Sequence, residues 1–120
     1  MKTVVLYRPV GQAELDLIAA SGHRRFPPRL PDQPIFYPVC NEEYATQIAS
    51  RWNTAHGRVG YVTRFAVRAE ALSRYPVQIV GSRIHAEHWI PAEELEAFND
   101  AIVGNIEVVA RYPAGGEASP

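Results

Sequence analysis

The sequence predicts an α+β domain with a mostly antiparallel sheet, and three observations lead to this prediction. Stretches that alternate apolar and polar residues, as half-buried strands do, are interleaved with stretches of helical periodicity. Most connections between these stretches are short, which favours antiparallel strands over parallel strands joined by long crossovers. The chain has 120 residues, 47% of them hydrophobic and 21% charged, which suits one globular domain with one core.

About six segments have the pattern of strands. The clearest is 60–67, where Tyr61, Thr63 and Phe65 alternate with Val62 and Arg64. Pro9 and Gly11 are expected to end the first strand, because proline cannot donate a hydrogen bond within a sheet. The expected strands are 3–8, 35–39, 60–67, 77–80, 86–90 and 105–112.

About three segments have apolar residues at helical spacing, and 69–75 adds a short helix or turn. The helices are expected at 12–20, from Asn41 onward and at 92–101. Asn41 is a suitable N-cap, and its helix has an apolar stripe of Tyr44, Ala45, Ile48, Ala49 and Trp52. Ser21-Gly22 and Gly104 are expected to end the first and last helices. The last helix has Pro91 at its first turn and Ala92, Leu95 and Phe98 on its apolar side.

The remaining segments are expected to be loops around one domain. Residues 23–34 hold four prolines and three arginines, which is typical of a loop with extended pieces, and 53–57 has the composition of a turn. The domain is expected to span 1–112, followed by a flexible tail at 113–120 that is rich in small residues and proline.

Composition argues against several classes of protein. The net charge of -1 leaves no basic excess to neutralise the phosphates of a nucleic acid. The longest apolar runs, such as 3–7, are too short to span a bilayer, and the first residues lack the pattern of a signal peptide, so we expect a cytoplasmic protein. A single cysteine, Cys40, excludes a disulfide framework. His85 and His88 would lie on opposite faces of a strand, so no metal site is expected.

Residues suited to ligand binding lie at three separate places. Tyr7 and Arg8 end the first strand, where the arginine fork suits a phosphate or a carboxamide. The second place, Phe36-Tyr37 with Tyr44 in the following helix, offers aromatic planes for a flat heterocycle. The alternatives are a surface ion pair for the arginine and core packing for each aromatic ring.

The third place is the segment 85–91, His-Ala-Glu-His-Trp-Ile-Pro. Glu87 lies between His85 and His88 and beside Trp89, which suits a charged, ring-bearing ligand. The alternative is an edge strand with solvated polar side chains. We expect all three places to meet in one cleft.

The order of these features resembles the ADP-ribosyltransferase-like fold. It is most similar to small bacterial proteins labelled "ADP-ribosylation/crystallin J1", and distantly similar to rifamycin ADP-ribosyltransferases and poly(ADP-ribose) polymerase catalytic domains. The matching features, from Val4 to about Tyr112, are Leu-Tyr-Arg in the first strand, Ile-Phe-Tyr before an Asn-capped helix with Tyr-Ala, and Glu-His-Trp-Ile-Pro.

The resemblance implies a split, mostly antiparallel sheet and NAD as the substrate. It implies that Arg8, with Tyr7 beside it, holds the ribose or nicotinamide side of NAD, and that Glu87 is the catalytic carboxylate. The ring that stacks on nicotinamide is Phe36 or Tyr37, with Tyr44 in the same site. The resemblance further places Ala45 under that ring.

The acceptor of ADP-ribose stays open between a protein, a small molecule, a nucleic acid and water. Arginine-specific relatives have a Glu or Gln two residues before the catalytic glutamate, where this chain has His85, so arginine modification is not expected. His85 or His88 could act as a base for the acceptor, or could only hydrogen-bond the backbone. Trp89 is a further auxiliary candidate.

Two other functions fit the same pattern. One is a catalytically inactive relative that binds a nucleotide or a partner, with the arginine-rich loop 24–29 as a docking segment. The other is an RNA- or phosphate-directed member of the superfamily, of the 2′-phosphotransferase type, using Arg8, Arg64 and Arg83. The low net charge argues against the latter.

Overall fold

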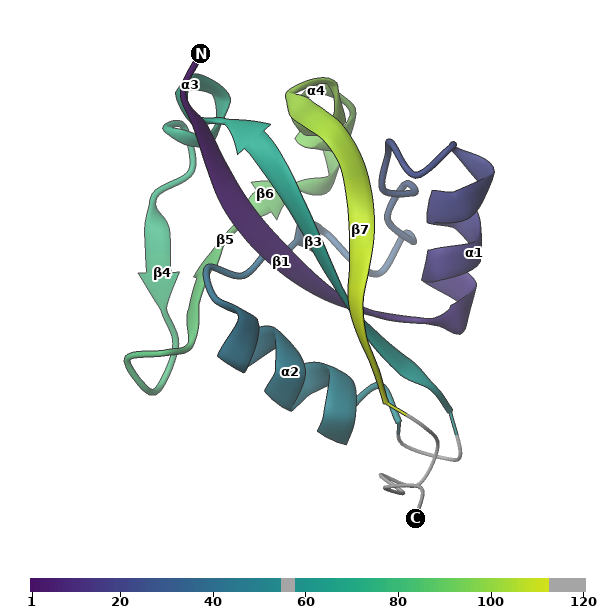
Figure 1. The fold of residues 1–120 in the computed structure, drawn as a ribbon. Helices are drawn as coiled ribbons and strands as arrows, with labels where there is room; N and C mark the ends of the chain where they lie inside the picture. Colours follow the sequence, from purple (N-terminus) through teal and green to yellow (C-terminus); the bar gives the residue numbers. More distant parts are fainter. Residues whose placement is uncertain (55–57, 113–120) are drawn as a thin grey trace.

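A computed structural model describes residues 1–54 and 58–112, which form seven strands and four α-helices (Figure 1). The predicted turn at 53–57 is described only in part, and the predicted flexible tail at 113–120 lies outside the described residues. The elements in chain order are β1 (Thr3–Gly11), α1 (Gln12–Ala20), β2 (Ile35–Phe36), α2 (Glu42–Arg51), β3 (Gly60–Arg68), α3 (Ala69–Leu72), β4 (Val77–Ile79), β5 (Ala86–His88), β6 (Ile90–Pro91), the 3₁₀ turn η2 (Ala92–Glu94), α4 (Leu95–Asp100) and β7 (Ile102–Tyr112).

The largest sheet has the strand order β1-β3-β7, and its three strands run side by side in Figure 1. β1 and β3 are antiparallel from the pair Thr3 and Arg68 to the pair Gly11 and Gly60. Two smaller antiparallel pairs, β2-β6 and β4-β5, complete the described sheets. The prediction of an α+β domain with antiparallel strands is therefore confirmed.

The segment around Val39 connects the large sheet to the β4-β5 pair. Val39 and Tyr7 exchange two backbone hydrogen bonds, of 2.9 and 2.8 Å, and Val39 also forms a bridge with Glu87. On the β5 side, the N–H of Cys40 donates to the carbonyl of Ala86. The structure therefore places Tyr7, Val39 and Glu87 next to one another on three adjacent chain segments.

Beyond this bridge, the outer edge of β1 pairs with no further strand among the described residues, and we call this place the opening of the sheet. Pro9 is suited to such an edge. β1 continues past the proline to Gly11, contrary to our prediction, because Pro9 still pairs with Val62 of β3 on its other side. The N–H of Tyr7 points toward Val39, and the Pro9 nitrogen, two residues on, lies at the same edge. Proline has no N–H to leave unpaired at a free edge, so it is tolerated there.

Two groups of buried side chains stabilise the fold. The larger contains an aromatic cluster in which the rings of Phe26, Phe36, Phe65 and Phe98 pack at centroid distances of 4.9 to 6.2 Å. The smaller lies under α2, which packs on β1 and β3, and contains Val39, Ala45, Ala49 and Val62. The α2 helix is thus held on the sheet beside the opening after Tyr7.

Several predicted elements have different bounds. The predicted strand 35–39 pairs only at β2 and at Val39. The strand 86–90 is divided at Trp89 into β5 and β6, and 77–80 ends at Ile79. Trp52, predicted to lie on the apolar stripe of α2, follows the last helical residue, Arg51, and is 76% exposed.

The last helix and strand also differ from the prediction. The predicted helix 92–101 begins as the 3₁₀ turn η2 and is α-helical only over Leu95–Asp100. Gly104 does not end this helix but lies inside β7 with φ of 79°. It accommodates a bulge, because Arg64 and Ala66 of β3 pair with Glu107 and Val103 of β7.

Candidate functional site

A groove of about 510 Å³ lies where β1, the Val39 segment and β5 meet. The predicted cleft residues reach it from three segments that are distant in sequence, with α2 forming a further wall. The lining residues are Arg8, Pro9, Tyr37, Val39, Tyr44, Ile48, Val80, Glu87 and Trp89. At least one residue from each of the three predicted places therefore lines one groove.

Glu87 is the acidic residue among the described residues that line the groove. Its side chain is buried, at 8% exposure, and both carboxylate oxygens accept hydrogen bonds. The Tyr44 hydroxyl donates to Oε1 at 2.7 Å, and the indole Nε1–H of Trp89 donates to Oε2 at 2.7 Å. Two donors on one carboxylate fix its orientation.

Tyr44 is held in place by the start of α2. The side chain of Asn41 accepts a hydrogen bond of 2.8 Å from the Tyr44 backbone N–H, which confirms the predicted N-cap. The Asn41 amide also donates to the carbonyl of Ile84 at 2.7 Å, which ties the helix to the loop before β5. Burial, followed by the hydrogen bond to Glu87, raises the pKa of Tyr44 to about 12, so its hydroxyl stays a donor near neutral pH.

His85 and His88 do not line the groove. The His85 ring stacks on Tyr44 with centroids 4.5 Å apart, and its Nε2 lies 3.0 Å from the side-chain oxygen of Gln47. His88 is buried, and its Nδ1 lies 2.6 Å from the carbonyl oxygen of Tyr75. His85 thus supports the tyrosine that holds Glu87, and His88 has the backbone contact that we kept as the alternative to a catalytic role.

Of the two adjacent aromatic rings, only Tyr37 reaches the groove. Tyr37 is 39% exposed and lines the groove, whereas Phe36 is 0% exposed and packs in the aromatic core. Neighbouring residues of an extended segment point to opposite sides, so the Tyr37 ring faces the groove and the Phe36 ring faces the core. Trp89, at 43% exposure, provides a second ring in the groove.

Arg8 lies at the groove but is already paired. Its Nε and Nη2 atoms donate to the two carboxylate oxygens of Glu14 at 2.7 and 3.0 Å, and Nη1 donates to the Tyr37 carbonyl at 3.3 Å. Its guanidinium carbon lies 4.5 Å from the centre of the Phe36 ring. The bidentate fork that we expected to hold a ligand is therefore bound to Glu14, a residue that the sequence analysis did not identify.

Tyr7 and Ala45 pack near the groove rather than lining it. Ala45 is fully buried in the small cluster under α2, and the half-buried Tyr7 packs against the same cluster. Cys40 follows Val39, and burial, together with the nearby charge of Glu87, raises the pKa of its thiol. The neutral form of Cys40 is favoured, which argues against a thiolate nucleophile beside Glu87.

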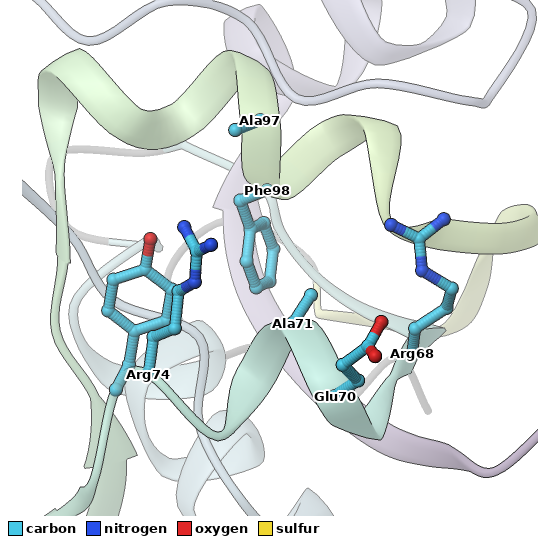
Figure 2. Close-up of a pocket in the computed structure, with 7 residues that line it drawn as sticks. Arg68, Glu70, Ala71, Arg74, Ala97 and Phe98 are labelled. Carbon is cyan, nitrogen blue, oxygen red and sulfur yellow. The ribbon is translucent and has the colours of Figure 1, made fainter.

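A separate pocket of about 240 Å³ lies between α3 and α4 (Figure 2). Figure 2 shows the ring of Phe98 with Arg74 on one side and Arg68 on the other, and Glu70 nearby. None of the residues predicted for the ligand site lines this pocket. Within residues 1–54 and 58–112, no group of three or more His, Cys, Asp or Glu side chains is arranged to hold a metal ion.

Comparisons of the chain with models of protein families, with curated proteins and with solved structures find no match. Across the part of the chain that the structure describes, none of the helices is both long and apolar enough to cross a membrane. We therefore infer the function from the geometry of the groove.

Proposed function

We propose that this chain is an NAD-dependent ADP-ribosyltransferase or NAD glycohydrolase in which Glu87 is the catalytic carboxylate. The observation that carries the proposal is the carboxylate of Glu87, buried in a groove and oriented by Tyr44 and Trp89. The bridge from Tyr7 to Val39 to Glu87, beside the opening of the sheet, supports an ADP-ribosyltransferase-like arrangement.

The proposed chemistry breaks the bond between C1′ of the ribose and the nicotinamide nitrogen. Nicotinamide leaves as a neutral molecule with the bonding electron pair, and positive charge develops on the ribose ring. Water or an acceptor hydroxyl or amine then bonds to C1′ and loses a proton. A fixed carboxylate stabilises the developing cation, and the effect is larger in a partly buried site than in water.

The rings of Tyr37 and Trp89 support a ligand with a flat heterocycle. Both are partly exposed in the groove, and its remaining wall includes Val39, Ile48 and Val80. Aromatic and aliphatic side chains with one oriented carboxylate are typical of a site for a small ring-bearing molecule. Tyr37, rather than Phe36, is the residue that we assign to stack on nicotinamide.

A second candidate is a nucleotide- or partner-binding module without turnover. It is favoured by the engagement of both Glu87 oxygens and by the ion pair between Arg8 and Glu14. In such a protein the same contacts serve only to shape a binding surface. Binding of NAD without release of nicotinamide is its expected behaviour.

The test measures NAD-dependent thermal stabilisation and release of free nicotinamide by the wild-type protein and two variants. Glu87→Gln keeps the shape but removes the charge, so we expect release to fall at least about 100-fold. Glu94→Gln is the matched control, because Glu94 also accepts a tyrosine hydrogen bond, from Tyr75, but does not line the groove. We expect Glu94→Gln to behave as wild type. Equal release by Glu87→Gln and wild type contradicts the catalytic role of Glu87.

A further inference from the structure

A third space, of about 360 Å³, shares two lining residues with the groove, Arg8 and Pro9. Its walls come from the end of β1, from α1 and from the proline-rich loop before β2. They include Gly11, Glu14, Leu17, Pro27 and Arg29. The two spaces are neighbours that share these two residues, and we call this one the Arg29 pocket.

Arg29 has binding capacity that its own fold contacts do not use. Its Nε donates to the carbonyl of Ile35 at 3.1 Å, which fixes the side chain. Among the described residues, its two terminal nitrogens make no hydrogen bond or ion pair. An arginine fixed through Nε still presents two planar donor groups, which match two oxygens of a phosphate.

The charges of the Arg29 pocket favour an anion. Two guanidinium groups, of Arg8 and Arg29, lie there with one carboxylate, Glu14, and that carboxylate is bound to Arg8. Burial lowers the pKa of Arg29, and the neighbouring charge of Arg8 lowers it further. The neighbouring charge of Glu14 opposes this shift, and a bound anion would likewise favour the charged form of Arg29.

We propose that the Arg29 pocket binds a phosphate group of the ligand, and that Arg29 rather than Arg8 makes the direct contact. Arg8 instead forms the wall between the ring-binding groove and the phosphate pocket. The inference rests on the proposed function for the ring end of the ligand, because it makes that ligand a nucleotide. The phosphate contact itself can be measured without any turnover.

The experiment measures the affinity of the full chain for ADP and for inorganic pyrophosphate by calorimetry, in wild type, Arg29→Gln, Arg29→Lys and Arg74→Gln. We expect Arg29→Gln to weaken ADP binding at least about tenfold, because a charge-assisted, bidentate contact is lost. We expect Arg29→Lys to retain part of the affinity. Arg74 lines the pocket between α3 and α4, so Arg74→Gln serves as the control for a general loss of positive charge.

Absence of ADP and pyrophosphate binding to wild type, or equal affinity in Arg29→Gln, overturns the phosphate pocket. Arg29-dependent ADP binding by a protein that releases no nicotinamide leaves the phosphate pocket intact and rejects the transferase proposal. Nicotinamide release with an unchanged KM for NAD in Arg29→Gln supports the transferase proposal and rejects the phosphate pocket. The thermal stability of each unliganded variant shows whether it is folded.

Discussion

The hydroxyl of Tyr44 donates a 2.7 Å hydrogen bond to Oε1 of Glu87, 43 residues further along the chain. This contact joins α2 to β5 across the groove, and the Asn41 cap fixes the tyrosine end. The second donor, Trp89, lies two residues after the carboxylate, just past the end of β5. Glu87 is therefore positioned by one local and one long-range contact, and the long-range one can be removed by itself.

Tyr44→Phe should lower both stability and nicotinamide release. Hydrogen bonds to charged groups contribute about 1.5–3 kcal/mol, and we expect a loss of unfolding free energy of about this size in urea titrations. Release should fall about tenfold, because Glu87 retains Trp89 but loses its orientation from α2. Tyr75→Phe removes a hydroxyl that donates to the exposed Glu94, and should cost below about 1 kcal/mol. Equal losses in the two variants would argue against a special contact at Glu87.

The raised pKa of Tyr44 predicts that the protein becomes less stable at alkaline pH. This pKa is raised from 10.0 to about 12, first by burial and then by the hydrogen bond to Glu87. The folded protein therefore favours the neutral phenol, and this contribution is complete below pH 10 and is lost as the pH rises toward 12. We expect a loss of up to about 2 kcal/mol after allowance for solvent screening.

Unfolding free energies of wild type and Tyr44→Phe, measured between pH 8 and 11.5, check whether stability falls as the pH rises. The difference between the two proteins should shrink as the pH rises above 10, because the phenol then ionises in the unfolded wild type, which stabilises the unfolded state relative to the folded one. A difference that stays constant over the whole range would contradict the assignment of the raised pKa to this hydrogen bond.

Substitutions of the two adjacent aromatic residues should have different effects, one on NAD binding and the other on the stability of the fold. Tyr37→Ala removes a partly exposed ring from the groove, so we expect weaker NAD binding by about tenfold and little change in melting temperature. Phe36→Leu alters a fully buried ring in the aromatic core, and should cost about 1–2 kcal/mol while binding stays similar. The reverse pattern would assign the stacking role to Phe36.

The sequence pattern was sufficient for the elements that depend on local chemistry. The helix 12–20 has the predicted bounds, and Asn41 caps α2 as expected, because helical spacing and a capping side chain act within a few residues. The meeting of the three places in one groove was a hypothesis that no local rule supplies, and the choice between Phe36 and Tyr37 stayed open until the structure placed Tyr37 in the groove.

The other features of the candidate site depend on packing between distant segments, which no local sequence pattern encodes. Phe36 and Tyr37 are both aromatic, so alternation alone cannot tell which ring faces the core. Glu14 meets Arg8 around the corner between β1 and α1, a separation of six residues that follows neither the strand nor the helix period. Arg29 lies in a proline-rich loop, where the sequence indicates only irregular structure.

Gly60→Ala should disturb the groove from a distance by displacing α2. A Cβ at this position would lie 2.2 Å from the carbonyl oxygen of Ala49 and 2.8 Å from the Cβ of Asn53. The first atom is backbone near the end of α2, so the helix must move away from β3, and Ala49 is part of the buried contact between them. We expect a loss of at least about 2–3 kcal/mol, as for other overpacked buried sites.

Gly11→Ala is the matched control for this effect, because a Cβ there meets nothing within 4 Å and its φ is -90°, which any residue adopts. Urea titrations of the two variants should show a large loss for Gly60→Ala and below about 0.5 kcal/mol for Gly11→Ala. If Tyr44 owes its position to the packing of α2, Gly60→Ala should also slow nicotinamide release at temperatures where it is fully folded. Wild-type stability in Gly60→Ala would show that α2 can shift freely on β3, and would remove the helix as a rigid support for Glu87.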